Sequence, residues 1–222
     1  MKMPIAAFSK CVPVALMLAA CAAICACTET RFASPPGTHL ENCDARWKGL
    51  WLPKAEADSG SAFFIDDACR FSVLDQPKNG NPMKRTGVKL NYVHAGGKDY
   101  LVVADGALKG LVDIRPVYGI DPAPAHAYFF ARYMATKDRI DVYSVDSEHV
   151  ASQIVAEKLD GTVSKTHNEL HVFVAGDSAH MLEILRDDSI FSSKPNIELE
   201  RSNMTVGEFE RRARKSLGDK KS

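Results

Sequence analysis

Short apolar segments alternate with turn residues along most of this chain. From Val88 to Val93, apolar and polar side chains take turns, so one face of the segment can enter a core. Similar segments recur at roughly regular spacing with Gly, Pro, Asn and Asp between them, which is typical of antiparallel strands. Eight strands are expected before the first helix: Trp47–Leu52, Ala62–Ile65, Arg70–Leu74, Val88–Val93, Tyr100–Ala104, Leu108–Val117, His126–Met134 and Ile140–Val145.

The hydrophobic period lengthens to that of a helix after Asp146, whose side chain can cap the first turn. Gly161 can supply the left-handed residue that ends this helix. The residues of its apolar stripe are Val150, Ala151, Ile154, Val155 and Leu159. A second helix is expected over Ser178–Arg186, and a third follows the capping box Thr205-Val206-Gly207-Glu208. Two more strands are expected, at Leu170–Val174 and Asn196–Leu199.

This order of elements predicts an α+β fold. We expect mainly an antiparallel β-barrel or sandwich of about eight strands, followed by two or three C-terminal helices. The segment Ser34-Pro35-Pro36-Gly37 belongs to a polar stretch that cannot bury a core of its own, so it is interpreted as a tether. The expected divisions are a signal over 1–26, the tether over 27–42, the β-rich domain over 43–204 and a basic amphipathic helix and tail over 205–222.

The first 26 residues have the layout of an export signal. Lys2 and Lys10 form a charged beginning, and an uncharged apolar run from Cys11 to Ala26 follows. This run contains Pro13 and is shorter than the roughly 20 residues that a membrane-spanning helix needs. The segment therefore indicates export.

The sequence Leu18-Ala19-Ala20-Cys21 resembles the lipobox of bacterial lipoproteins. The resemblance implies that a diacylglycerol is attached to the Cys21 sulfur, that the chain is cleaved just before it, and that fatty acids such as palmitate anchor the product. Cys27 is the alternative, because it follows Ile24-Cys25-Ala26 and would leave a polar new N-terminus. Neither cysteine is followed by Asp, which favours the outer membrane, with the domain facing the periplasm.

Charge and cysteine content limit the remaining possibilities. The 222 residues carry 28 basic and 28 acidic side chains, so the chain offers no electrostatic footprint for nucleic acid. In an oxidising compartment Cys43 and Cys69 are expected to form a disulfide.

Gly49-Leu50-Trp51 resembles the Gly-x-Trp motif of lipocalins. Eight strands, a helix and one more strand is also the element order of that family. The resemblance implies a closed barrel whose interior takes a small apolar ligand.

Two segments are candidates for catalysis. Gly176-Asp177-Ser178 between a strand and a helix resembles the first block of GDSL-type hydrolases, which implies Ser178 as a nucleophile. No histidine follows His180, and His180 lies too close to Ser178 on the helix to act as its base, so Asp177 is interpreted as a helix cap.

On a strand, His167, Glu169 and His171 would share one face, and two imidazoles with a carboxylate can hold a metal ion. We favour a solvated strand face here and expect no cofactor.

Arg211, Arg212, Arg214 and Lys215 make the C-terminal helix basic, so it could lie on an anionic membrane, although docking on the domain is favoured. Together these patterns predict a non-enzymatic, lipid-anchored protein of the bacterial cell envelope. It would bind the membrane through its lipid, and a protein or a small apolar ligand through its domain. The alternative is an envelope hydrolase that uses Ser178 or a metal at His167, Glu169 and His171.

Overall fold

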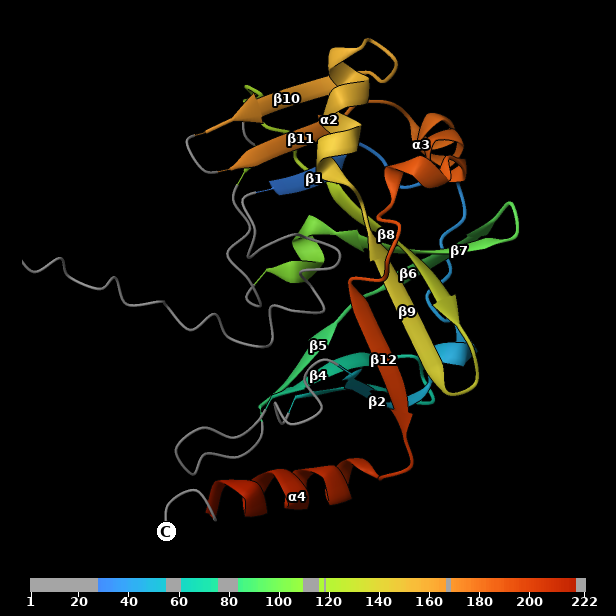
Figure 1. The fold of residues 1–222 in the computed structure, drawn as a ribbon, viewed down its shortest axis with the longest axis vertical. Helices are drawn as coiled ribbons and strands as arrows, with labels where there is room; N and C mark the ends of the chain where they lie inside the picture. Colours follow the sequence, from blue (N-terminus) through green and yellow to red (C-terminus); the bar gives the residue numbers. More distant parts are fainter. Residues whose placement is uncertain are drawn as a thin grey trace, which may run out of the picture.

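The computed structural model describes residues 28–54, 61–75, 84–109, 116–117, 119–166 and 169–218 (Figure 1). Its strands are β1 (Thr28–Phe32), β2 (Gly49–Pro53), β3 (Ala62–Ile65), β4 (Phe71–Asp75), β5 (Lys84–Val88), β6 (Asn91–Ala95), β7 (Lys98–Ala104), β8 (Tyr128–Ala135), β9 (Arg139–Ser144), β10 (Gly161–Lys165), β11 (Leu170–Val174) and β12 (Ile197–Ser202). The α-helices are α2 (Ser147–Val155), α3 (Ser178–Arg186) and α4 (Val206–Gly218), and short 3-10 turns are η1 (Ala45–Trp47), η3 (Asp105–Leu108) and η4 (Asp188–Ile190).

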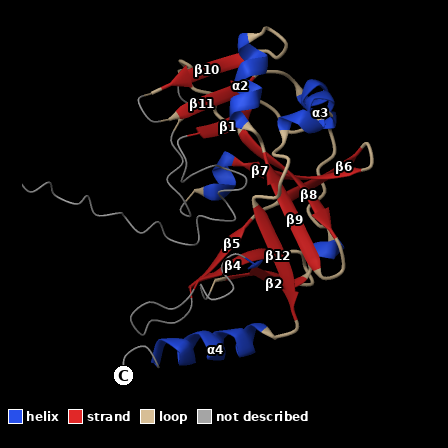
Figure 2. Ribbon diagram, in the orientation of Figure 1, coloured by secondary structure: helices blue, strands red, loops and turns tan. Residues whose placement is uncertain are grey.

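The strands form one branched sheet. Its main path runs β10-β11-β1-β8-β9-β12-β2-β3-β4-β5, while β7 also pairs with β8 and β6 pairs with β7. The branch lies on β8, where Tyr128 pairs with Phe32 of β1 and residues 131–135 pair with β9. Among the described strands only β1 and β11 run parallel. Helix α2 packs on β10, β11 and β1, α3 lies to the right of α2, and α4 lies at the far end of the molecule (Figure 2).

The α+β class is confirmed, but the closed barrel is wrong. The path of the sheet ends at β10 on one side and at β5 on the other, and these two strands do not pair. The sheet stays open because β1 and β9 occupy the same edge of β8 in succession, which sends the two halves in different directions. A lipocalin-type closed interior therefore does not form.

Two hydrophobic cores fill the two halves. The larger core lies among β2–β9 and β12 and contains both tryptophans, Trp47 and Trp51, each fully buried. The second core lies between the sheet and the helices α2 and α3. Its buried members are Phe32, Val93, Tyr100, Val102, Phe130, Val150, Ala151, Val172, Val174, Met181, Ile184, Leu185, Ile190 and Phe191. The predicted stripe of α2 is confirmed at Val150 and Ala151, but Val155 is 75% exposed and Leu159 lies beyond the end of the helix. In α3 the expected Met181 and Leu185 are buried.

The expected polar tether over 27–42 is wrong at its beginning, because residues 28–32 form β1 inside the sheet. Phe32 is 0% exposed and stacks on Phe130 with ring centroids 4.1 Å apart. Thr30 is buried and donates a 2.8 Å hydrogen bond to Ser147. A short polar segment becomes a strand here because β11 and β8 supply its backbone partners, which composition alone does not reveal.

Several other boundaries differ. The helix α2 ends at Val155 and the turn at Glu157 has φ 58°, so Gly161 begins the unexpected strand β10 instead of ending the helix. The expected strand Leu108–Val117 is wrong at its start, because Leu108 belongs to η3. Residues 110–115 lie outside the described part. The expected strand Val88–Val93 is divided between β5 and β6. The strand Ala62–Ile65 and the helix Ser178–Arg186 are confirmed at both ends.

Candidate functional site

A network of charged side chains surrounds η1, whose Trp47 belongs to the larger core. The buried carboxylate of Asp44 accepts hydrogen bonds from Arg46 Nη2 at 2.7 Å and from Tyr133 Oη at 2.5 Å. It also accepts from the backbone N–H of Arg46, so it caps η1. Arg46 extends the network by an ion pair with Asp99 at 2.7 Å.

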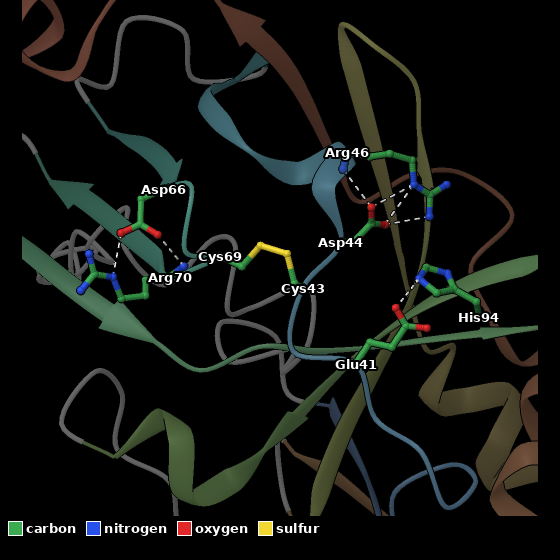
Figure 3. The surroundings of a disulfide bond; sticks show 8 residues. All are labelled: Glu41, Cys43, Asp44, Arg46, Asp66, Cys69, Arg70 and His94. Atoms are coloured by element: carbon green, nitrogen blue, oxygen red, sulfur yellow. Dashed lines mark hydrogen bonds and ion pairs between the residues drawn. A yellow bond between two sulfur atoms is a disulfide. The ribbon is translucent and has the colours of Figure 1, made fainter.

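The network continues at the surface through His94. Its Nδ1 lies 2.6 Å from Asp99 Oδ1. Its Nε2 lies 3.7 Å from Glu41 Oε2, the contact that Figure 3 shows. With a carboxylate on each side, the imidazole can act as a bridge between the loop before η1 and the β6–β7 hairpin. The sequence contains no motif that predicts this cluster, because its members are scattered from Glu41 to Tyr133.

The titration of these groups favours the charged pair. Burial opposes ionisation of Asp44, but hydrogen bonds from Arg46 and Tyr133 outweigh it and hold the pKa of the carboxyl below its usual 3.8. The pKa of Asp99 is lowered in the same way, with burial outweighed by hydrogen bonds from Arg46 and His94. Burial, reinforced by the adjacent Asp44 carboxylate, raises the pKa of Tyr133 well above its usual 10.0. The tyrosine therefore stays a proton donor to Asp44 at neutral pH.

A disulfide stands beside this network. Cys43 and Cys69 are bonded, with Cα atoms 5.3 Å apart and a separation of 26 positions in the sequence (Figure 3). It ties the segment that carries Asp44 to the β3–β4 turn, where Asp66 and Arg70 form an exposed ion pair. By constraining the unfolded chain, a loop of this length contributes about 3 kcal/mol to stability.

The Arg201 side chain contacts the backbone at η1 and the ring of Trp51. Its guanidinium lies over the Trp51 ring at 4.2 Å from the centroid and donates to three backbone carbonyls, those of Lys137, Lys48 and Arg46. A side chain on Gly49 would obstruct this arrangement, because its Cβ would lie 2.7 Å from Arg201 Nη1. In this fold Gly49-Leu50-Trp51 therefore serves to seat an arginine against a buried tryptophan.

Arg201→Met is expected to lower the free energy of unfolding by about 3 kcal/mol. Three hydrogen bonds at roughly 1 kcal/mol each are lost, together with a cation–π contact, while the methionine keeps much of the apolar stem. Urea unfolding of the lipid-free chain from Thr28 onward measures the change.

Arg70→Met is the matched control, because the Arg70 side chain is 80% exposed and its ion pair with Asp66 should be worth less than about 1 kcal/mol. Equal losses of unfolding free energy in the two variants would show that the contacts of Arg201 with Trp51 and the backbone add no stability.

The proposed nucleophile Ser178 occupies the first turn of α3. Asp177 caps this helix by accepting a 2.9 Å hydrogen bond from the backbone N–H of His180. Within the described residues no hydrogen bond joins the Ser178 hydroxyl to a histidine or a carboxylate. The cap is therefore confirmed, and no serine–histidine pair involving Ser178 is assembled among the residues that the structure describes.

Glu169 and His171 lie at the start of β11, and His167 lies outside the described residues. The His171 ring contacts carboxylates on both sides, with Nδ1 2.9 Å from Glu29 Oε1 and Nε2 3.2 Å from Glu169 Oε2. Glu29 is paired in turn with the buried Arg31 at 3.0 Å. In the described part of the chain, no group of three or more His, Cys, Asp or Glu side chains is arranged to hold a metal ion.

The C-terminal helix α4 docks on the domain. Phe209 and Ala213 are buried, and Phe209 packs with Leu50, Ala62 and Leu74 of the sheet. The capping box is confirmed, since Thr205 N–H donates to Glu208 at 2.7 Å and Glu208 N–H donates to Thr205 at 3.2 Å. The side chain of Leu217 lies outside the described part. Exposed on the helix are Arg211, Arg212, Arg214 and Lys215.

The two candidate lipidation sites, Cys21 and Cys27, lie outside the described residues. In the portion that is described, no helix has the length and hydrophobicity required to cross a bilayer. Comparison with protein-family models, curated proteins and solved structures finds no match to this chain.

Proposed function

We propose that this chain is an exported, lipid-anchored protein of the bacterial cell envelope whose domain works by binding rather than by catalysis. The observation that carries the proposal is the Cys43–Cys69 disulfide behind an N-terminal segment with a lipobox-like Leu18-Ala19-Ala20-Cys21. Disulfides persist in oxidising compartments such as the periplasm, and an export signal directs the chain there. We place it at the outer membrane, facing the periplasm.

A binding role is supported by the contacts that the candidate catalytic segments already make within the domain. Both ring nitrogens of His171 contact carboxylates, and the first turn of α3 uses Asp177 as a cap. The open sheet supplies no closed barrel interior for a small apolar ligand. A protein partner on the surface of the domain is therefore the form of the proposal that we favour.

The anchor is tested by cysteine substitution. Cys21→Ala combined with Cys27→Ala is expected to move the protein from the membrane to the soluble fraction and to abolish labelling by radioactive palmitate. Each single substitution then identifies the lipidated residue, because only one of them should have this effect.

Cys25→Ala is the matched control, since it removes a neighbouring cysteine of the same segment and should leave both readouts unchanged. A double variant that remains in the membrane and still takes up palmitate would overturn the proposal.

A further inference from the structure

The anchor and the domain are separated by very little chain. The sheet begins at Thr28, which pairs with Leu170 across the β1–β11 ladder. If Cys27 carries the lipid, no residue lies between anchor and strand; if Cys21 carries it, six residues do. Six residues and their flanking bonds span at most about 25 Å when fully extended.

This reach is short compared with the domain. Chain-length scaling gives a folded chain of this size a radius of gyration of about 16 Å, and hence a diameter of about 40 Å. An anchor that reaches less than one diameter cannot let the domain turn its opposite end toward the bilayer. The end of the sheet where β1 starts is therefore held next to the membrane.

The residues at this end suit a bilayer surface. Thr28 lies in register with Leu170, and Leu170 lies in register with Lys165, whose side chain is exposed. The neighbouring carboxylate of Glu29 forms an ion pair with Arg31, and both Glu29 and Glu169 contact the ring nitrogens of His171. Paired carboxylates weaken the repulsion from anionic lipid headgroups, and an exposed lysine adds attraction.

We propose that the end of the sheet formed by Thr28, Lys165 and Leu170 faces the lipid bilayer that holds the anchor. The proposal rests on the proposed lipid anchoring and adds to it a fixed orientation. The opposite ends of these strands, where Gly161, Val174 and Phe32 lie in register, point away from the membrane (Figure 1).

Two exposed lysines provide a matched pair of reporters. Lys165 ends β10 at the proposed membrane side, and Lys158 precedes the other end of the same strand. The five residues of β10 separate these ends by about 13 Å. Lys165→Cys and Lys158→Cys would each be labelled with a fluorophore after Cys25 and any unlipidated cysteine among Cys21 and Cys27 are replaced by serine.

The lipidated full-length protein is then reconstituted into phosphatidylethanolamine–phosphatidylglycerol vesicles that contain headgroup-nitroxide lipids. The label at residue 165 is expected to be quenched about twofold more than the label at residue 158, because the quencher acts over a distance comparable with the length of β10. Equal quenching, or stronger quenching at residue 158, would overturn the proposed orientation.

Flotation of the vesicles separates this outcome from failure of the anchor. Protein that does not float with the vesicles contradicts lipid anchoring and the orientation together, whereas protein that floats with equally quenched labels contradicts the orientation alone. A flexible spacer of about 20 Gly and Ser residues inserted between Cys27 and Thr28 should remove the difference, since it adds about 70 Å to the extended reach of the connection, more than one domain diameter. A difference that survives the spacer would overturn the short connection as its cause.

Discussion

A chain that begins at Cys43, where the sequence pattern places the start of the domain, is expected not to fold, whereas a chain that begins at Thr28 is expected to fold cooperatively. Deleting residues 28–42 removes β1 from the middle of the sheet, so β11 keeps only β10 as a backbone partner and the contact of β11 with β8 through β1 is lost. It also removes the fully buried Phe32, which on its own is worth about 3–5 kcal/mol. The sum approaches or exceeds the roughly 5–15 kcal/mol by which domains are stable.

Circular dichroism and urea unfolding of the two lipid-free chains measure this difference. Phe32→Ala in the longer chain is the graded control, because it removes the ring without removing the strand and should leave a weakened but cooperative transition. A chain from Cys43 with the same transition midpoint as the chain from Thr28 would show that β1 is dispensable.

Asp44→Ala is expected to lower the free energy of unfolding by about 4 kcal/mol. The substitution leaves the buried hydroxyl of Tyr133 without its acceptor, removes the cap of η1 and breaks the ion pair with Arg46. The unpaired buried hydroxyl costs about 1–3 kcal/mol and the lost cap about 1 kcal/mol. The lost ion pair adds about 1 kcal/mol or less, because the Arg46 side chain is 41% exposed and keeps its pair with Asp99.

Asp66→Ala is the control for this substitution. Asp66 also pairs with an arginine and accepts a backbone hydrogen bond, but its partner Arg70 is largely exposed, so a loss of about 1 kcal/mol or less is expected. Urea unfolding at pH 7 compares the two variants, and equal losses would contradict the importance that we give to burial at Asp44.

The same network sets a pH dependence. Because the pKa of folded Asp44 lies below 3.8, its contribution is present above that pH and is lost as the pH falls through 3.8 toward the folded value. Because the pKa of folded Tyr133 lies above 10.0, its contribution is present below pH 10 and is lost as the pH rises further. Asp44→Ala should flatten the acid side of the stability profile.

Local sequence signals predicted the elements that depend on neighbours in the chain. A short apolar run followed by the turn residues Asp66-Asp67 located Ala62–Ile65, and the Asp177 cap with the apolar stripe that follows it located α3. The signals failed where distant segments decide. Thr28–Phe32 has little apolar character, and it becomes a strand because β11, more than 130 residues away, lies beside it. Gly161 is a residue type that often ends a helix, but in this fold it is the first residue of β10.

The candidate site was less predictable than the fold. The Asp44 network combines Arg46 of η1, Tyr133 of β8 and, through Arg46, Asp99 of β7, and no spacing in the sequence predicts that these residues meet. Trp51 was identified through its motif, but its partner Arg201 is 150 residues later and carries no motif of its own. Such contacts are products of the topology.

The parallel pairing of β1 with β11 also sets an order of assembly. The chain is made from its N-terminus, so β1 is synthesised before every other strand that the structure describes. Its partner strand β11 comes much later, since His171 of β11 follows its register partner Glu29 of β1 by 142 positions. Until β11 pairs with β1, the backbone N–H and C=O groups of β1 remain available to other chains. Pairing over such a sequence distance is slow. The protein is therefore expected to depend on a holding chaperone during the interval between the emergence of its first strand and the closure of its sheet.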